Sequence, residues 1–168
     1  MRAAEELRYL VLAAQREGNR MLARELRPLG ITPSQAEVIR VLDDHQPLTL
    51  NGLGELLVCE TGTNPSRLVD RLVTAGTVAR KPSEQDRREV EITLTPQGRE
   101  LAARIATIED RLYSWLDAAA GRDPDGVLAV LRSLVADLPA GLALARRTAL
   151  QHEASAARGT RASWRKTS

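Results

Sequence analysis

Two short stretches of the sequence concentrate side chains that can bind phosphate or the edge of a nucleic-acid base. The stretch 63–75 carries hydrogen-bonding residues at helical spacing, and the stretch 82–88 ends in two consecutive arginines. The guanidinium group of arginine presents its donors in a planar fork that matches phosphate oxygens and the major-groove edge of guanine. The candidate contact residues are Thr63, Asn64, Ser66, Arg67, Arg71, Arg87 and Arg88.

The stretch 63–75 has the apolar pattern of an amphipathic helix. Thr63 or Asn64 can cap this helix, Pro65 is tolerated because it falls in the first turn, and Gly76 ends it. On a wheel of about 100° per residue, its apolar residues share one half, which we expect to pack on the preceding helices. They are Pro65, Leu68, Val69, Leu72 and Val73. The polar half then faces outward, either toward a nucleic acid or toward water alone.

The stretch 77–95 has the pattern of a two-stranded hairpin. TVARK (77–81) and EVEITLT (89–95) flank a polar loop, and the second strand alternates apolar and polar residues with a period of two. A loop between two short strands can enter the minor groove, whose narrow negative potential attracts arginine. We expect Asp86 to turn back and hold Arg88 or a backbone amide. The plain alternative is a hairpin tip whose arginines only keep it soluble.

Helices are predicted on both sides of these stretches. TPSQ (32–35) has the form of a capping box with proline in the first turn, and a short helix follows Thr49. Three short helices followed by a hairpin are the order of a winged helix-turn-helix, in which the third helix enters the major groove. Longer amphipathic helices are predicted over 3–26, 96–120 and 124–138, with a further helix to about Ala157. They carry more apolar surface than one small domain needs as cover, which favours a twofold helical dimer.

The composition is that of an ordinary soluble globular protein. The chain has 168 residues, 43% hydrophobic residues and a formal net charge of +2. Cys59 is the single cysteine, so no internal disulfide can form and a reducing cytoplasm is the expected compartment. The N-terminal residues lack the apolar core of a signal peptide, and no apolar run reaches the ~18 residues that span a bilayer. We therefore expect a cytoplasmic, nucleoid-associated protein with no membrane partner.

The sequence offers no set of residues that predicts catalysis or metal binding. It contains no phosphate-binding Walker loop, no dinucleotide-binding glycine pattern and no pairing of nucleophile and base that the spacing would suggest. His45 and His152 lie far apart and without cysteine or carboxylate neighbours at ligand spacing. We therefore predict that the protein is not an enzyme, needs no cofactor and holds no metal.

Several segments resemble the MarR family of bacterial transcription regulators. They are ITPSQAEVIRVL, SRLVDRLVTAGTVARK and DRREVEITLTPQGREL, and the resemblance covers roughly residues 7 to 150. It implies a mainly α fold with a small β-hairpin wing, in which a winged helix-turn-helix domain joins a helical dimerisation domain. The implied parts are an N-terminal dimerisation helix (1–30), a winged helix-turn-helix DNA-binding domain (31–95) and C-terminal dimerisation helices (96–157). Residues 158–168 lie outside the resemblance and, with four basic residues and no acid, are predicted to form a basic tail.

The resemblance also implies how such a protein works. A homodimer would offer two winged helices to a pseudo-palindromic operator in double-stranded DNA, most often as a repressor. Arg88 would reach the minor groove, and Asp70 would pair with Arg88 when DNA is absent, which makes Asp70 and Asp86 the residues that support the wing. Relatives often bind a small anionic aromatic effector in the cleft between the two domains. Effector-binding residues are unknown here, although the helices that could line such a cleft carry Tyr9, Arg16, Tyr113 and Trp115.

Two other functions stay open from the sequence. The first is a helical protein-interaction module whose winged helix docks a protein in place of DNA. The second is a thiol-based redox regulator that uses Cys59. In the thiol-sensing members of the family the cysteine lies in the first helix, which has none here, and the neighbouring Glu60 should raise the pKa of the Cys59 thiol.

Overall fold

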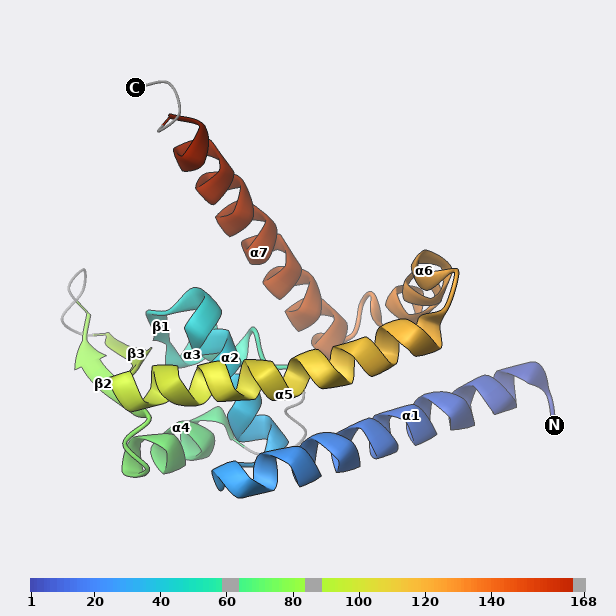
Figure 1. Ribbon diagram of the computed structural model, residues 1–168, viewed down its shortest axis with the longest axis horizontal. Coiled ribbons are helices and arrows are strands. Elements are labelled where there is room, and N and C mark those ends of the chain that lie inside the picture. The colour runs from blue at the N-terminus through green and yellow to red at the C-terminus, as the bar shows by residue number, and fades with distance from the viewer. Residues whose placement is uncertain (59–63, 84–88, 165–168) are drawn as a thin grey trace.

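The computed structural model describes the backbone of residues 1–58, 64–83 and 89–164 and the side chains of these residues as far as Glu153 (Figure 1). In this part of the chain, helices surround a small antiparallel sheet. The elements in chain order are α1 (Ala3–Leu26), the 3-10 helix η1 (Arg27–Leu29), α2 (Pro33–His45), β1 (Leu48–Thr49), α3 (Leu50–Gly54), α4 (Pro65–Thr74), β2 (Val78–Pro82), β3 (Val90–Leu94), α5 (Pro96–Ala120), α6 (Pro124–Val135) and α7 (Pro139–Trp164).

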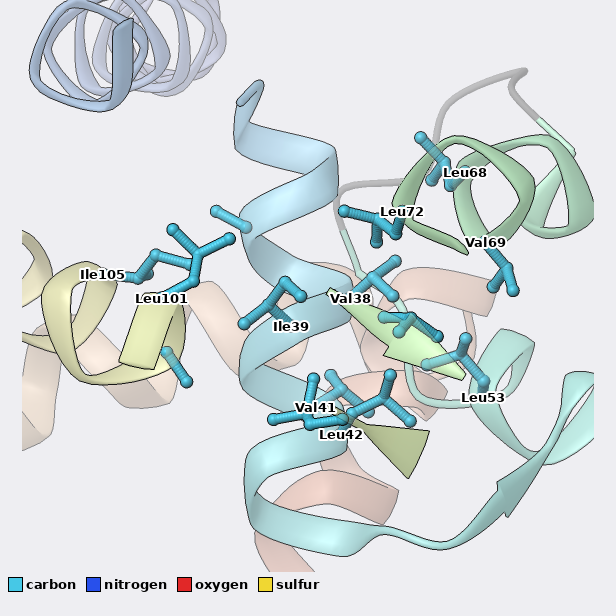
Figure 2. Packing of buried hydrophobic residues seen from close by; sticks show 14 of the residues in the cluster. Val38, Ile39, Val41, Leu42, Leu53, Leu68, Val69, Leu72, Leu101 and Ile105 are labelled. Carbon is cyan, nitrogen blue, oxygen red and sulfur yellow. The ribbon is translucent and has the colours of Figure 1, made fainter. Parts of the chain in front are cut away.

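Helix α2 lies at the centre of the buried core, between α4 and α5 (Figure 2). Its Val38 and Ile39 are completely buried. Figure 2 shows Ile39 directed toward Ile105 of α5, whereas Val38 lies on the side of α2 that meets Leu72 of α4. The core also takes in Leu26 at the end of α1. One continuous core therefore crosses the boundaries predicted at residues 30 and 95, and it fixes α4 relative to α5.

The start of α2 confirms the capping box. The Thr32 hydroxyl accepts a hydrogen bond from the Gln35 amide at 3.3 Å, and the Gln35 side chain accepts one from the Thr32 amide at 2.9 Å. Pro33 occupies the first position of the helix. Because the first amides of a helix have no partner within it, this exchange satisfies donors that would otherwise be left open.

The predicted hairpin forms, and a third strand joins it. The strand order is β1-β3-β2, with all pairs antiparallel, and β3 pairs Leu94 with Val78 and Ile92 with Arg80. Strand β1 is only two residues long, so no alternation in the sequence could have revealed it. The Gln46 side chain accepts a hydrogen bond from the Leu94 amide at 2.7 Å, which joins the sheet to the end of α2.

Helix α5 begins tight against the turn that follows α4. The Thr95 hydroxyl accepts a hydrogen bond from the Gly98 amide at 3.0 Å and donates one to the Gly76 carbonyl at 2.7 Å. A side chain at Gly98 would collide with the carbonyl of Thr77, so only glycine permits this approach. Gly76 itself has a φ of 73°, the left-handed conformation expected where a helix stops. The segment LTPQG thus places the wing beside α4.

The remaining helices expose a large apolar surface. Figure 1 shows α1 and α5 extending together away from the winged helix and α6 at the far end of α5, while α7 starts beside α5 and runs away from it toward the C-terminus. The exposed apolar side chains on these helices include Leu7, Leu10, Val11, Leu12, Trp115, Leu116, Val127, Leu128, Val130, Leu131, Leu134, Leu142 and Leu144. Helix α7 continues to Trp164, beyond the predicted end at about Ala157, so residues 158–164 of the predicted basic tail are helical.

The central position of α2 gives a prediction for stability. Ile39→Ala should lower the free energy of unfolding by about 2–5 kcal/mol, because it opens a cavity between α2 and α5. The matched control is Val90→Thr at a half-exposed position of β3, for which we expect a change within about 0.5 kcal/mol. Urea denaturation at one fixed protein concentration measures both. A loss at Ile39 no larger than that of the control would contradict the packing described.

Candidate nucleic-acid interface

Helix α4 has one buried and one exposed face. Leu68, Val69 and Leu72 are buried against the core, as the periodicity predicted. The outward face carries polar side chains whose residues are all exposed: Asn64, Arg67, Asp70, Arg71 and Thr74. The buried half holds the helix in place. The outward half is exposed, and a helix of this kind fits into the major groove of DNA.

The N-terminus of α4 is capped by Asn64. The Asn64 side-chain oxygen accepts a hydrogen bond from the Ser66 amide at 2.9 Å, and Pro65 occupies the first helical position. Of the two residues that the sequence offered as the N-cap of α4, Thr63 and Asn64, the structure has Asn64 in that position. A helix N-terminus carries partial positive charge from its backbone dipoles, so Ser66 lies where a phosphate is favoured.

An ion pair joins the outward face of α4 to the wing. The Asp70 carboxylate lies 2.7 Å from a terminal guanidinium nitrogen of Arg80 on β2. Arg80 could not be singled out from the sequence, because it is an exposed residue of β2 and its partner lies on a different element. Both side chains are partly exposed, so the pair orients the two elements more than it stabilises them.

Four of the predicted site residues lie outside the described residues: Thr63, Asp86, Arg87 and Arg88. The expected pair between Asp70 and Arg88 therefore stays a prediction, beside the observed pair with Arg80. The strands on either side of the loop are well anchored. The buried Ser83 donates its amide to the Glu89 carbonyl at 2.9 Å and its hydroxyl to the Glu91 carboxylate at 2.6 Å. The loop 84–88 consequently leaves from a closed hairpin end.

Charged contacts also tie α2 to α5 behind the candidate interface. Arg40 donates to Glu109 of α5 at 3.0 Å and to Asp43 at 2.9 Å. Burial by itself lowers the pKa of the Arg40 guanidinium, but Glu109 and the neighbouring carboxylates outweigh burial and raise that pKa above its usual value. Burial raises the pKa of the Tyr113 phenol, and the Glu109 carboxylate raises it further. The Arg40 guanidinium therefore stays charged and the Tyr113 phenol stays neutral near neutral pH.

The residues considered for an effector do not meet in a described cavity. A cavity of about 370 Å³ is lined by residues of η1, α2, α4 and the first turns of α5, including Gln35, Gln97 and Arg104. A second, of about 330 Å³, lies between α3 and the start of α4. Neither is lined by the four residues that the sequence analysis considered, which are Tyr9, Arg16, Tyr113 and Trp115.

The described parts of the chain contain neither a helix that could span a membrane nor a cluster of metal-ligating side chains. No described helix combines the length and the apolar character needed to cross a bilayer. The described histidine, cysteine, aspartate and glutamate residues nowhere gather in a group of three that could hold a metal ion.

Comparison with known proteins identifies the family. The model of the MarR family matches residues 31–90, the segment from α2 to the start of β3. Over 138 residues the chain is 30% identical to the organic hydroperoxide resistance transcriptional regulator of Bacillus subtilis, covering 82% of this chain and 92% of that protein. The chain belongs to the MarR family. As a MarR-family member it is a winged-helix transcriptional regulator, and the resemblance inferred from the sequence is confirmed.

Solved structures of MarR-family proteins have the same fold. One is a complex of Staphylococcus aureus MepR with DNA, with a TM-score of 0.69 and 25% identity, covering 77% of this chain and 96% of that one. Another is a cysteine-to-serine mutant of E. coli MarR complexed with operator DNA, with a TM-score of 0.66 and 27% identity, covering 77% and 93%. Among sequences, S. aureus MgrA is 29% identical over 111 residues, covering 66% of this chain and 75% of that protein. The two sequence relatives are named as transcriptional regulators, and the two solved structures are complexes with DNA.

The ion pair between α4 and β2 gives the second prediction. Asp70→Asn and Arg80→Gln should each change the free energy of unfolding by less than about 1 kcal/mol, because partly exposed pairs are screened by water. The two changes should be less than additive, since either removes the same contact. Urea denaturation of both single variants and the double variant measures the coupling. Strict additivity would mean that the two side chains do not interact in solution.

Proposed function

We propose that this MarR-family protein binds double-stranded DNA sequence-specifically as a homodimer, with α4 in the major groove and the loop 84–88 in the adjacent minor groove. The observation that carries the proposal is the outward face of α4, where Arg67 and Arg71 are exposed on a helix whose other face is buried. The DNA complexes of MepR and MarR, which share the fold, support it.

The residues divide into two roles by their position. Arg67 and Arg71 lie one helical turn apart on α4, so their guanidinium groups can contact successive base edges or phosphates along a groove. Asn64 and Ser66 lie at the helix N-terminus, and Thr63 immediately precedes them; this is a position suited to phosphate. Arg87 and Arg88 would enter the minor groove from the wing. Asp70, paired with Arg80, keeps the wing oriented toward α4.

The exposed apolar surface supports a homodimer. It extends over the N-terminal half of α1, the C-terminal half of α5, and α6 and α7. Monomeric proteins rarely leave this many large apolar side chains exposed on helices that contact one another, and long helices from both ends of a chain can form a twofold bundle. A twofold dimer presents two copies of α4, so the operator would be pseudo-palindromic, with half-sites about one turn of DNA apart.

Occupation of such an operator would most simply block transcription, which makes a repressor the preferred form of the proposal. Release by a small anionic aromatic effector stays a prediction from the family resemblance. Redox regulation through Cys59 also stays a prediction, because Cys59 lies outside the described residues. Helix α1, which carries the sensing cysteine in thiol-sensing members of the family, contains no cysteine here. Docking of a protein to the winged helix is the outcome against which DNA binding has to be tested.

Binding to DNA should show a steep dependence on salt. If six or more phosphates are neutralised, the affinity of the full chain for its selected operator should fall by about 10³-fold between 50 and 200 mM salt. Selection of bound sequences from random DNA provides the operator, and fluorescence anisotropy at several salt concentrations provides the slope. An affinity for duplex DNA that is weak and independent of salt would favour a protein partner.

Substitutions should separate the two elements that contact DNA. Arg67→Ala should relax the preference for one base pair, with a loss of about 1–3 kcal/mol on the preferred operator, if Arg67 contacts a guanine. Arg88→Ala should weaken binding to all sequences similarly and lower the salt slope by about 1. Arg20→Ala on the exposed surface of α1 is the control and should change neither quantity. The reverse pattern would mean that the roles of α4 and the wing are exchanged.

A charge within the exposed apolar surface should disrupt the dimer. Leu131→Asp on α6 should shift the mass measured by sedimentation from two chains toward one, because a carboxylate without a partner is costly to bury. Val90→Asp, at an exposed apolar position on β3 away from these helices, is the matched control. An unchanged mass for Leu131→Asp would place the subunit contact elsewhere.

A further inference from the structure

A buried carboxylate connects α2, the chain before α4, and α7. Glu37 lies on α2 and is only 8% exposed. Its Oε1 atom accepts a hydrogen bond from the Val58 amide at 2.7 Å and one from the Arg147 side chain of α7 at 3.1 Å. Three parts of the molecule that are distant in the sequence therefore meet at one side chain, which we call the Glu37 junction (Glu37, Val58 and Arg147).

Arg147 places a positive charge within hydrogen-bond distance of the buried Glu37 carboxylate. A buried carboxylate loses its hydration, and an opposite charge within hydrogen-bond distance is the usual compensation. The Arg147 side chain is itself mostly covered, with 22% of its surface exposed, so water screens the pair weakly. An ionised carboxylate is also the stronger acceptor for the Val58 amide. The carboxylate oxygen that accepts from Val58 is thus also held by an arginine of α7.

Val58 is the last described residue before the segment that leads into α4. The residues just before it are fixed by burial, since Leu56 is 4% and Leu57 is 6% exposed. The Glu37 junction adds a directional contact at the end of this segment, where the backbone leaves the core. Residues 59–64 join Val58 to Pro65, the first residue of α4, so the position of Val58 limits where α4 can begin.

A second arginine of α7 supplies a matched comparison. Arg146 lies 3.5 Å from Glu55, in the same segment, but the two side chains are 53% and 62% exposed. Ion pairs with this exposure contribute little, because both charges stay hydrated. Arg146 and Arg147 thus share the helix and the charge, and they differ in their partner and in burial.

We propose that Arg147 is a positioning residue for DNA recognition: through Glu37 it holds Val58, and so α7 sets the placement of α4 without touching DNA. The proposal rests on the proposed function, because it concerns the affinity of α4 for an operator. It also gives a physical route by which a change in α7, one of the helices that carry the exposed apolar surface, reaches the DNA-binding face.

The test compares variants of the full chain on the operator selected by the unsubstituted protein. Arg147→Gln and Glu37→Gln should each weaken operator binding by about five- to tenfold. The double variant should be no weaker than either single variant, because both changes break one linkage. Arg147→Lys should recover part of the affinity, since it keeps the charge. Arg146→Gln should stay within about twofold of the unsubstituted protein, because its pair is exposed.

Two further readouts distinguish positioning from other roles. The slope of affinity against salt should be the same in Arg147→Gln as in the unsubstituted protein, because no phosphate contact is lost. Amide hydrogen exchange at Val58 should become faster in Arg147→Gln and in Glu37→Gln, and it should not change in Arg146→Gln. Sedimentation should give the same mass for all variants.

Several results would overturn the proposal. Unchanged affinity and unchanged exchange at Val58 in Arg147→Gln would mean that the junction does not act on α4. A salt slope lowered by about 1 would make Arg147 a direct phosphate contact. A loss of affinity that follows dissociation into single chains would make Arg147 a dimer contact. Failure of the unsubstituted protein to bind any duplex would instead overturn the proposed function, and it would be seen before any variant is made.

Discussion

The burial of α2 on both of its sides is the constraint on which the rest of the structure depends. One side of α2 packs against α4 and the other packs against α5, so Val38 and Ile39 belong to one core although they face different helices. Because protein interiors are close-packed, a helix held on two sides transmits position from one neighbour to the other. The outward face of α4 is presented at a defined angle because its inward face is held in this way.

Charged side chains reinforce the same helix at its edges. Arg40 pairs with Glu109 of α5, and Glu37 pairs with Arg147 of α7 and holds the Val58 amide. Such pairs add little net stability after the cost of removing them from water, but they admit one geometry and penalise others. Apolar packing therefore supplies most of the stability of α2, and these pairs specify how the long helices sit against it.

Local features of the sequence predicted the helices and the hairpin, but contacts between residues distant in the sequence could not be predicted. The capping box at Thr32 and the two faces of α4 could be predicted, because caps and helical periodicity involve residues within one or two turns. The pair of Asp70 with Arg80 and that of Glu37 with Arg147 could not, since each depends on how separate elements pack. The helical continuation of α7 beyond residue 157 was missed because its sequence has no apolar periodicity.

The central claim is that α4 and the wing approach one duplex in different grooves, and methylation interference tests it most directly. Dimethyl sulfate adds a methyl group to guanine N7 in the major groove and to adenine N3 in the minor groove, so it reports on both grooves in one experiment. On the selected operator, the account predicts interference at guanine N7 in two clusters about 10 base pairs apart, with interference at adenine N3 beside each cluster. Interference confined to one groove, or a single cluster without its twofold counterpart, would contradict it.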